Sequence, residues 1–233
     1  MREIVFLLLL TAVVSAGLDQ SYEHRVMADG ESTIQKTMEM SLFSDEETLA
    51  KVEAVCSSNP SCDVDNKTIT IRESLTPGQY YSFEDSYGLF IDYELTIKKI
   101  PTDVFSRNLD SILREAEVID EDSSSAAATD LLADNSETAE FLRKFNVSIT
   151  YTVEMPMDIT EAGAGDVAGQ IDGKKATFDI VEVMGNPGPI VVKSSQINSS
   201  YLIIGAGIIA FAALAVMYFR PGKKQSNKKR KKR

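Results

Sequence analysis

The sequence predicts an α+β fold: an antiparallel sheet with two or three packed helices, followed by a single C-terminal transmembrane helix. Apolar and polar residues alternate along 89–97 and along 145–155, the period of a strand with one wet face. Apolar residues recur at helical spacing along 44–56 and 102–118. The segment 201–219 holds 19 residues without a charge, enough at about 1.5 Å per residue to cross the hydrocarbon layer of a bilayer.

The N-terminal residues 1–16 are predicted to be a cleaved signal peptide. Arg2 precedes the apolar run 4–14, which is too short to span a bilayer, and small residues end the segment at Ala16 in the pattern that signal peptidase accepts. The alternative is an uncleaved N-terminal anchor. Cleavage after Ala16 would leave a mature chain that begins outside the cytoplasm.

Residues 17–200 are predicted to form one extracytoplasmic α+β domain. Near its start, the Asp29-Gly30 pair lies between two extended runs, which is typical of a tight hairpin turn whose two central residues need positive φ. His24 lies in the first of these strands. We interpret it as an exposed strand residue; the alternative is a catalytic base.

Two amphipathic helices interrupt the strands. A capping box at Ser44 and Glu47 begins the first, which places Leu49, Val52 and Cys56 on one face. The second helix follows a proline, and its apolar stripe consists of Phe105, Leu109, Ile112, Leu113 and Ala116. Both stripes are expected to pack on the dry face of the sheet.

The second half of the domain begins with an acidic segment at about 120–135. It is poor in β-branched and aromatic residues, so it buries too little apolar surface to offset its ordering entropy, and we expect a flexible loop. A short helix is expected at 137–145. After the strand that ends at residue 155, we expect a Gly-rich loop, a strand at 176–183 and a last strand at 190–193.

The charges separate into two groups along the chain. Residues 17–200 hold 34 of the 35 acidic residues and 14 of the 24 basic ones, a net charge of −20, whereas the tail 220–233 holds nine basic residues and no acid. The acidic domain argues against nucleic acid as a partner, because Lys and Arg supply most of that affinity. It favours cations or basic partners.

The basic tail predicts the orientation of the protein in the membrane. Lys and Arg accumulate on the cytoplasmic side of transmembrane helices, and anionic lipid headgroups attract each such charge near the surface by about 1 kcal/mol. We therefore expect an integral, single-pass type I protein of the cell membrane, with the N-terminal domain outside and the C-terminus cytoplasmic. In a eukaryotic host the endoplasmic reticulum membrane would be expected.

The only two cysteines, Cys56 and Cys62, lie in the exported part, where oxidising conditions let disulfides persist. We expect them to pair. Closure of so short a loop would contribute roughly 2 kcal/mol in the chain-entropy model. A zinc site is the alternative, but His24, the only histidine, and two cysteines do not complete a zinc ligand set.

Three N-glycosylation sequons begin at Asn66, Asn146 and Asn198. Asn66 and Asn146 are the candidate sites, and Asn146 falls on the polar face of its predicted strand. Asn198 is crowded against the membrane segment. The alternative is chance, because a chain rich in Ser and Thr yields such triplets readily.

No motif predicts an enzyme, a cofactor or a metal site. "GAGDVAG" has its glycines spaced GxGxxxG with no amphipathic helix after it, so we interpret it as a loop. "DVDNK" begins like a calcium loop, but Lys67 occupies the fifth position, so we expect a turn between short strands. The sequence contains no GxSxG, HExxH or CxxC motif.

The run "FNVSITYTVEMP", the loop that ends in "QIDG", the strand "KKATFDIVE" and the closing apolar helix together resemble the LppM-like domain family of exported, membrane-tethered proteins. The resemblance is strongest over 145–183. In that family an extended strand ends in a Pro-Gly turn, and an Asp-Gly turn precedes a strand with an aromatic residue. Pro156, Asp172-Gly173 and Phe178 stand in those places.

This chain departs from the family pattern at several points. Met157 replaces the Gly, Phe178 stands where Trp is commoner, and no lipobox Cys follows the signal, so lipoprotein anchoring is not carried over. The resemblance implies an α+β ectodomain with an antiparallel sheet and an apolar cavity for a lipid-like ligand. It supplies no catalytic residues.

These observations favour a binding or interaction module, whose ligand would be a lipid-like or envelope component or a partner protein. The first alternative is a structural subunit of a membrane protein complex, docked through small residues of the apolar helix and the basic tail. A less favoured alternative is an unrecognised hydrolase. The common catalytic triads would require His24, since the chain has no second histidine, whereas a Ser-Lys arrangement or a pair of acids would not.

Overall fold

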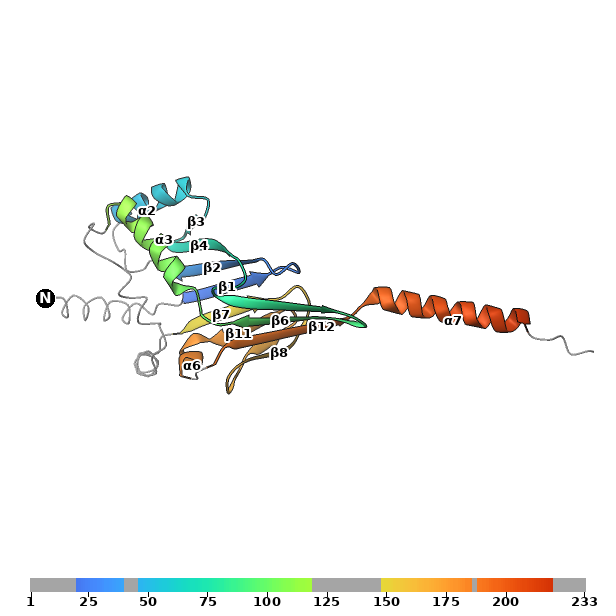
Figure 1. The fold of residues 1–233 in the computed structure, drawn as a ribbon. Coiled ribbons are helices and arrows are strands. Elements are labelled where there is room, and N and C mark those ends of the chain that lie inside the picture. The colour runs from blue at the N-terminus through green and yellow to red at the C-terminus, as the bar shows by residue number, and fades with distance from the viewer. Residues whose placement is uncertain (1–19, 40–45, 119–147, 186–187, 220–233) are drawn as a thin grey trace, which may run out of the picture.

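The computed structural model describes residues 20–39, 46–118, 148–185 and 188–219. Within them the chain forms two sheets, a small group of helices and one long projecting helix (Figure 1). The expected acidic loop at 120–135 and the short helix at 137–145 lie outside the described residues, as do the signal segment and the basic tail.

The larger sheet has seven described strands, and all neighbours run antiparallel except β7 and β1. In order across the sheet they are β10 (Gln170–Asp172), β11 (Lys175–Asp179), β7 (Ile149–Glu154), β1 (Gln20–Val26), β2 (Ser32–Glu39), β4 (Thr68–Leu75) and β3 (Cys62–Asp65).

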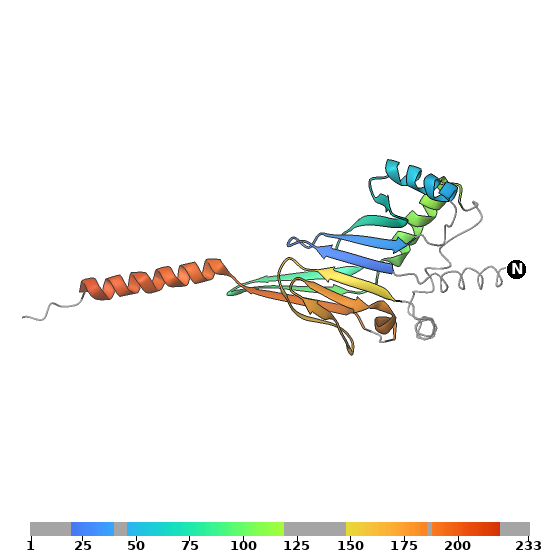
Figure 2. The same ribbon diagram turned by 180° about the vertical axis from the view of Figure 1, so that it is seen from behind.

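The smaller sheet has five described strands, all antiparallel to their neighbours. In order they are β5 (Tyr81–Tyr87), β6 (Phe90–Ile97), β12 (Ile190–Ile197), β8 (Ile159–Ala164) and β9 (Val167–Ala168). The two sheets form separate layers, visible from both sides of the molecule (Figures 1 and 2).

Buried side chains from both sheets form one hydrophobic core. Tyr151 and Val153 enter it from the larger sheet, and Leu95 and Val192 from the smaller one. Tyr81 links the layers, because its hydroxyl donates to the Gly30 carbonyl at 2.7 Å. The α+β prediction is therefore confirmed, with two antiparallel-rich sheets in place of one.

Both predicted amphipathic helices are present. They are α2 (Glu46–Ser58) and α3 (Thr102–Glu115), which lie together at the end of the sheets remote from the projecting helix (Figures 1 and 2). Val52 is buried on α2, and Phe105 is buried on α3, where its ring contacts Tyr22 of β1 edge to face at 5.6 Å. Burial of side chains of this size stabilises the fold by about 1.5–3 kcal/mol each.

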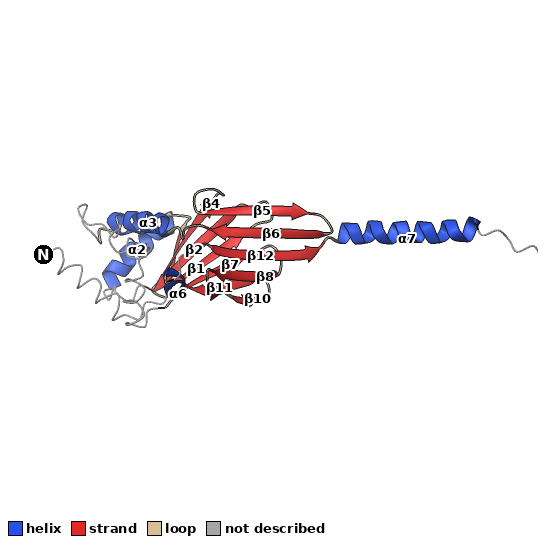
Figure 3. Ribbon diagram, turned by 60° about the horizontal axis from the view of Figure 1, so that its bottom comes forward, coloured by secondary structure: helices blue, strands red, loops and turns tan. Residues whose placement is uncertain are grey.

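The projecting helix is α7 (Ser199–Phe219), which begins where β12 ends (Figure 3). It confirms the predicted C-terminal apolar helix. Its 21 residues span about 31 Å at 1.5 Å per residue. It is the one helix among the described residues that is long and apolar enough to cross a membrane, and it is not buried against the domain.

The hairpin predicted at Asp29-Gly30 joins β1 to β2, but its geometry differs from the expected one. Gly30 has a φ of +83°, while Asp29 keeps a negative φ, so the turn is not the two-residue type that needs positive φ at both positions. The Gly30 N–H donates to the Met27 carbonyl, and the Met27 N–H donates to the Glu31 carbonyl. A side chain at Gly30 would collide with Phe83.

The structure differs from the expectations for the C-terminal part in three places. The strand predicted at 176–183 ends at Asp179, and α6 (Ile180–Met184) follows, because the Asp179 carboxylate accepts the Val181 N–H at 2.8 Å and caps a helix. The stretch after Pro156, expected to be a loop, contains β8 and β9, joined by a turn with Gly165 at a φ of +59°. The last strand, β12, also extends four residues beyond residue 193.

Candidate functional site

The structure corrects the prediction for His24. Its side chain is 1 % exposed, on the inner face of the larger sheet, and not on the surface as expected. The Nδ1 atom lies 2.8 Å from the Tyr151 hydroxyl, and the Nε2 atom lies 2.8 Å from the Ser32 hydroxyl. Tyr22 and Val26, two residues before and after it, are buried on the same face of β1.

The contact between His24 and Ser32 has the geometry of a base and a nucleophile, but it lies inside the core. Both residues are fully buried, so a substrate has no route to the Ser32 hydroxyl in this arrangement. Burial also lowers the pKa of His24 to about 4, which keeps the ring neutral near pH 7, with one nitrogen donating and the other accepting. The group is therefore a satisfied hydrogen-bond network that stabilises the sheet.

A second buried polar group, formed by Lys36 and Tyr22, lies next to His24 on the inner face of the larger sheet. Lys36 of β2 is directly opposite Tyr22 of β1, and its ammonium lies 5.3 Å from the centre of the Tyr22 ring. Burial lowers the pKa of Lys36 to about 8 and raises the pKa of Tyr22. Among the described residues, the Tyr22 hydroxyl has no hydrogen-bond partner. Within the described part of the chain, the contact that stabilises the buried Lys36 ammonium is thus the aromatic face of Tyr22.

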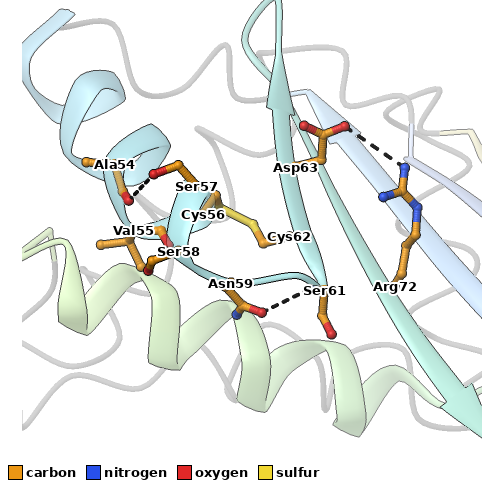
Figure 4. Close-up of a disulfide and its surroundings, with 10 residues drawn as sticks. All are labelled: Ala54, Val55, Cys56, Ser57, Ser58, Asn59, Ser61, Cys62, Asp63 and Arg72. Carbon is orange, nitrogen blue, oxygen red and sulfur yellow. Dashed lines mark hydrogen bonds and ion pairs between the residues drawn. A yellow bond between two sulfur atoms is a disulfide. The ribbon is translucent and has the colours of Figure 1, made fainter.

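The cysteine prediction agrees with the structure, in which Cys56 and Cys62 form a disulfide (Figure 4). The bond joins the last turn of α2 to the first residue of β3. The Asn59 side chain accepts the Ser61 N–H at 3.0 Å and orders the turn between them. The disulfide therefore attaches the helical end of the domain to the edge of the larger sheet.

A surface groove of about 310 Å³ lies on the smaller sheet, along β5, β6 and β12. We call it the acidic groove, since its charged lining consists of Glu84, Asp85, Asp92, Glu94 and Lys193. Tyr93 of β6 and Ser194 of β12 also line the groove, although both are buried. The residues directly before and after them in each strand are more exposed and face outward. Most of the charged lining, including Glu84, Asp92 and Glu94, is thus on the outer, solvent-facing side of the sheet, whereas Asp85 pairs with Tyr93 and alternates to the other face of β5.

The strand register places like charges side by side in the acidic groove. Glu84 of β5 is directly opposite Glu94 of β6, an arrangement that destabilises a sheet. Lys193 is opposite Glu94, but its ammonium is shared, at 3.9 Å from Glu94 and 3.5 Å from Glu161. Within the described ranges neither Glu84 nor Asp85 has an ion-pair partner. The groove therefore has a surplus of negative charge that a cationic ligand would relieve.

Sequence reasoning missed the acidic groove as a site. The alternation in 89–97 already placed Asp92 and Glu94 on the wet face of one strand. The sequence pattern does not reveal that this strand pairs with β5 and β12. That pairing brings Glu84, Asp85 and Lys193 beside Asp92 and Glu94. Among the residues described, no three His, Cys, Asp or Glu side chains converge in a way that could hold a metal ion.

The sequons fall in different surroundings. Asn66 is exposed in the two-residue turn between β3 and β4, where it and Lys67 both have positive φ, at 48° and 65°. This agrees with the turn expected for "DVDNK". Asn146 lies outside the described residues. The amide of Asn198 donates to the Gly88 carbonyl at 3.2 Å, and its oxygen accepts the Ser200 N–H at 3.1 Å.

Comparison with known proteins adds no assignment. No protein-family model, curated protein or solved structure matches the chain. The resemblance to the LppM-like domain family stays a prediction, and the candidate site stands on its geometry alone.

Proposed function

We propose that this protein is a single-pass type I membrane protein that holds an acidic binding module outside the cytoplasm. The apolar helix α7 supports the anchor, because it continues directly from β12 and projects away from the domain (Figure 3). The basic tail 220–233 supports the orientation, because positive charge accumulates on the cytoplasmic side. The signal expected at 1–16 agrees with an exported domain.

The acidic groove is the ligand-binding surface in this proposal. The observation that supports this most is the direct apposition of Glu84 and Glu94, of which only Glu94 has an ion pair among the described residues, with the shared Lys193, together with the net charge of −20 in residues 17–200. A basic segment of a partner protein fits this chemistry, because extended Lys and Arg side chains can reach carboxylates on adjacent strands. The charged lining gives no support to a lipid-like ligand in the groove. No catalytic step is assigned to the module.

A cationic probe tests the ligand proposal. The full chain in lipid nanodiscs is titrated into a labelled decalysine peptide, and fluorescence anisotropy reports binding. Glu84→Gln with Glu94→Gln should weaken binding roughly fivefold, about 1 kcal/mol for two partly screened surface charges. The matched control is Glu46→Gln with Glu53→Gln on α2, which removes the same charge from exposed positions.

The comparison between the two double variants decides the outcome. A loss confined to the groove variant supports the site, whereas an equal loss in both means that only net charge attracts the peptide. Wild-type protein that fails to bind decalysine at low salt overturns the cationic-ligand proposal. Stoichiometric cross-links to one neighbour in native membranes would instead support the structural-subunit alternative.

Protease accessibility tests the orientation. A protease added to intact cells should degrade the α+β domain and spare an epitope placed after Arg233. Degradation of the epitope with protection of the domain would reverse the orientation. Protection of both would place the protein in an internal membrane.

A further inference from the structure

We propose that the tip of the β5–β6 hairpin is a second membrane contact, which inserts into the lipid interface beside α7. The contact surface, here the stem-end cluster, consists of Tyr87, Leu89, Phe90, Ile197 and Tyr201. Its members are 47–60 % exposed. Within the part of the chain that the structure describes, four of the six exposed large apolar side chains that precede α7 belong to this cluster, so exposed apolar surface is concentrated at one place.

Hydrogen bonds hold the hairpin tip against the start of α7. The Asn198 N–H donates to the Leu89 carbonyl at 2.9 Å, and the Asn198 amide donates to the Gly88 carbonyl. The Asn198 side-chain oxygen also caps α7 through the Ser200 N–H. Ile197 pairs with Phe90 in the sheet. One residue thus joins the hairpin tip to the first turn of the helix, and the tip reaches the helix start in every view (Figures 1, 2 and 3).

The composition of the tip matches the depth of a lipid interface. Residues 86–90 carry no charge, and the nearest acids are Asp85 and Asp92. At about 3.3 Å per residue, Asp92 lies roughly 10 Å along the strand from Leu89. Interfacial segments bury their apolar side chains about 5–10 Å into the headgroup region, so insertion of the tip would leave both carboxylates in water. Tyrosines such as Tyr87 and Tyr201 favour this level of the bilayer.

The position of the stem-end cluster indicates that lipid covers it. This inference rests on the proposed membrane anchor: if α7 spans the bilayer, the lipid surface begins at its first turn, where the cluster lies. The cluster is then continuous with the lipid-facing surface of α7, and its exposed apolar side chains leave water by contact with lipid. A domain held by a helix and a hairpin has a fixed height and tilt above the bilayer.

The absence of tryptophan from the sequence makes the test direct. Single-tryptophan variants of the full chain are reconstituted in phosphatidylcholine vesicles with brominated acyl chains, which quench tryptophan on contact. Leu89→Trp reports the hairpin, Phe211→Trp reports α7, and Lys51→Trp reports the exposed surface of α2 at the far end. The Leu89 and Phe211 variants should show blue-shifted emission and lose most of their fluorescence, while the Lys51 variant should keep its fluorescence.

The pattern of quenching separates the two proposals. Quenching at position 211 without quenching at 89 overturns the hairpin contact and leaves the anchor intact. No quenching at 211 means that the anchor itself fails. Phe90→Trp provides a second probe of the tip if the Leu89 variant does not fold, and an unquenched, red-shifted signal from it would likewise overturn the inference.

Discussion

Replacement of His24 by glutamine should remove a pH dependence from the stability of the domain. In the folded protein burial lowers the pKa of His24 to about 4, whereas the unfolded chain keeps the ordinary value of 6.5. Above pH 6.5 the ring is neutral in both states. Between pH 6.5 and 4 only the unfolded chain takes up a proton, so the free energy of unfolding falls as the pH falls.

The size of the effect follows from the two pKa values. A difference of one pKa unit corresponds to 1.36 kcal/mol, so the wild-type protein should lose about 3 kcal/mol of stability through His24 as the pH drops to about 4. His24→Gln has no such group, although its amide can still contact Ser32 and Tyr151. The free energy of unfolding of wild type should therefore fall by about 3 kcal/mol relative to that of the variant between pH 7 and pH 4.

Urea unfolding of the full chain in nanodiscs measures this difference. Tyrosine fluorescence is a suitable signal, since the chain has eight tyrosines and no tryptophan. The contributions of all other residues are common to both proteins, so the quantity of interest is the free energy of unfolding of wild type minus that of the variant at each pH. Parallel stability curves for the two proteins between pH 7 and 4 would refute the buried, neutral histidine.

Three further predictions concern other buried or surface groups. Lys36→Met should raise the free energy of unfolding at pH 7 by up to about 3 kcal/mol, because it removes a buried charge. This gain in the free energy of unfolding should shrink between pH 8 and 10.5, because folded Lys36 has lost its proton there while the unfolded chain still holds it. A variant less stable than wild type would show that the buried ammonium stabilises the fold. Cys56→Ala with Cys62→Ala should lower stability by about 2 kcal/mol in urea melts, and an unchanged midpoint would mean that the loop is ordered without the bond. In a glycosylating host, Asn66→Gln should abolish a gel shift caused by the attached glycan. Asn198→Gln should leave that shift unchanged, because the Asn198 amide already donates a hydrogen bond to the Gly88 carbonyl. The reverse result would contradict this assignment.

Periodicity in the sequence was sufficient for the elements that have one clear wet face. Leu95 and Ile97 in β6, and Phe105 and Ile112 in α3, are buried as their spacing predicted. The expectation for His24 was wrong because the polarity of an imidazole ring favours an exposed position, whereas its spacing from Tyr22 and Val26 places it on the buried face of β1. Its partner Tyr151 is 127 residues away, and no local pattern reveals such a contact.

The other two differences between expectation and structure have different origins: one is a local signal in the sequence, and the other is a pairing of distant strands. Asp179 followed three residues later by Glu182 is a helix-start signal within an apolar run, and its cap outweighed the strand propensity of Ile180 and Val181. The acidic groove, in contrast, depends on the placement of β12 between β6 and β8. Glu94 and Lys193 become neighbours only through that pairing, which is a property of the folded chain and not of either segment.

The parallel pairing of β1 with β7 sets the order in which the domain can fold. β1 lies between β7 and β2, so the centre of the larger sheet is incomplete until residues 149–154 have been synthesised. At about 5–20 residues per second, the 127 residues between His24 and Tyr151 take roughly 6–25 s to make. During that interval the β1–β2 hairpin exposes one long edge and the apolar face around Tyr22. Chaperone binding to the nascent chain is expected in this window, and it should end when β7 covers the edge.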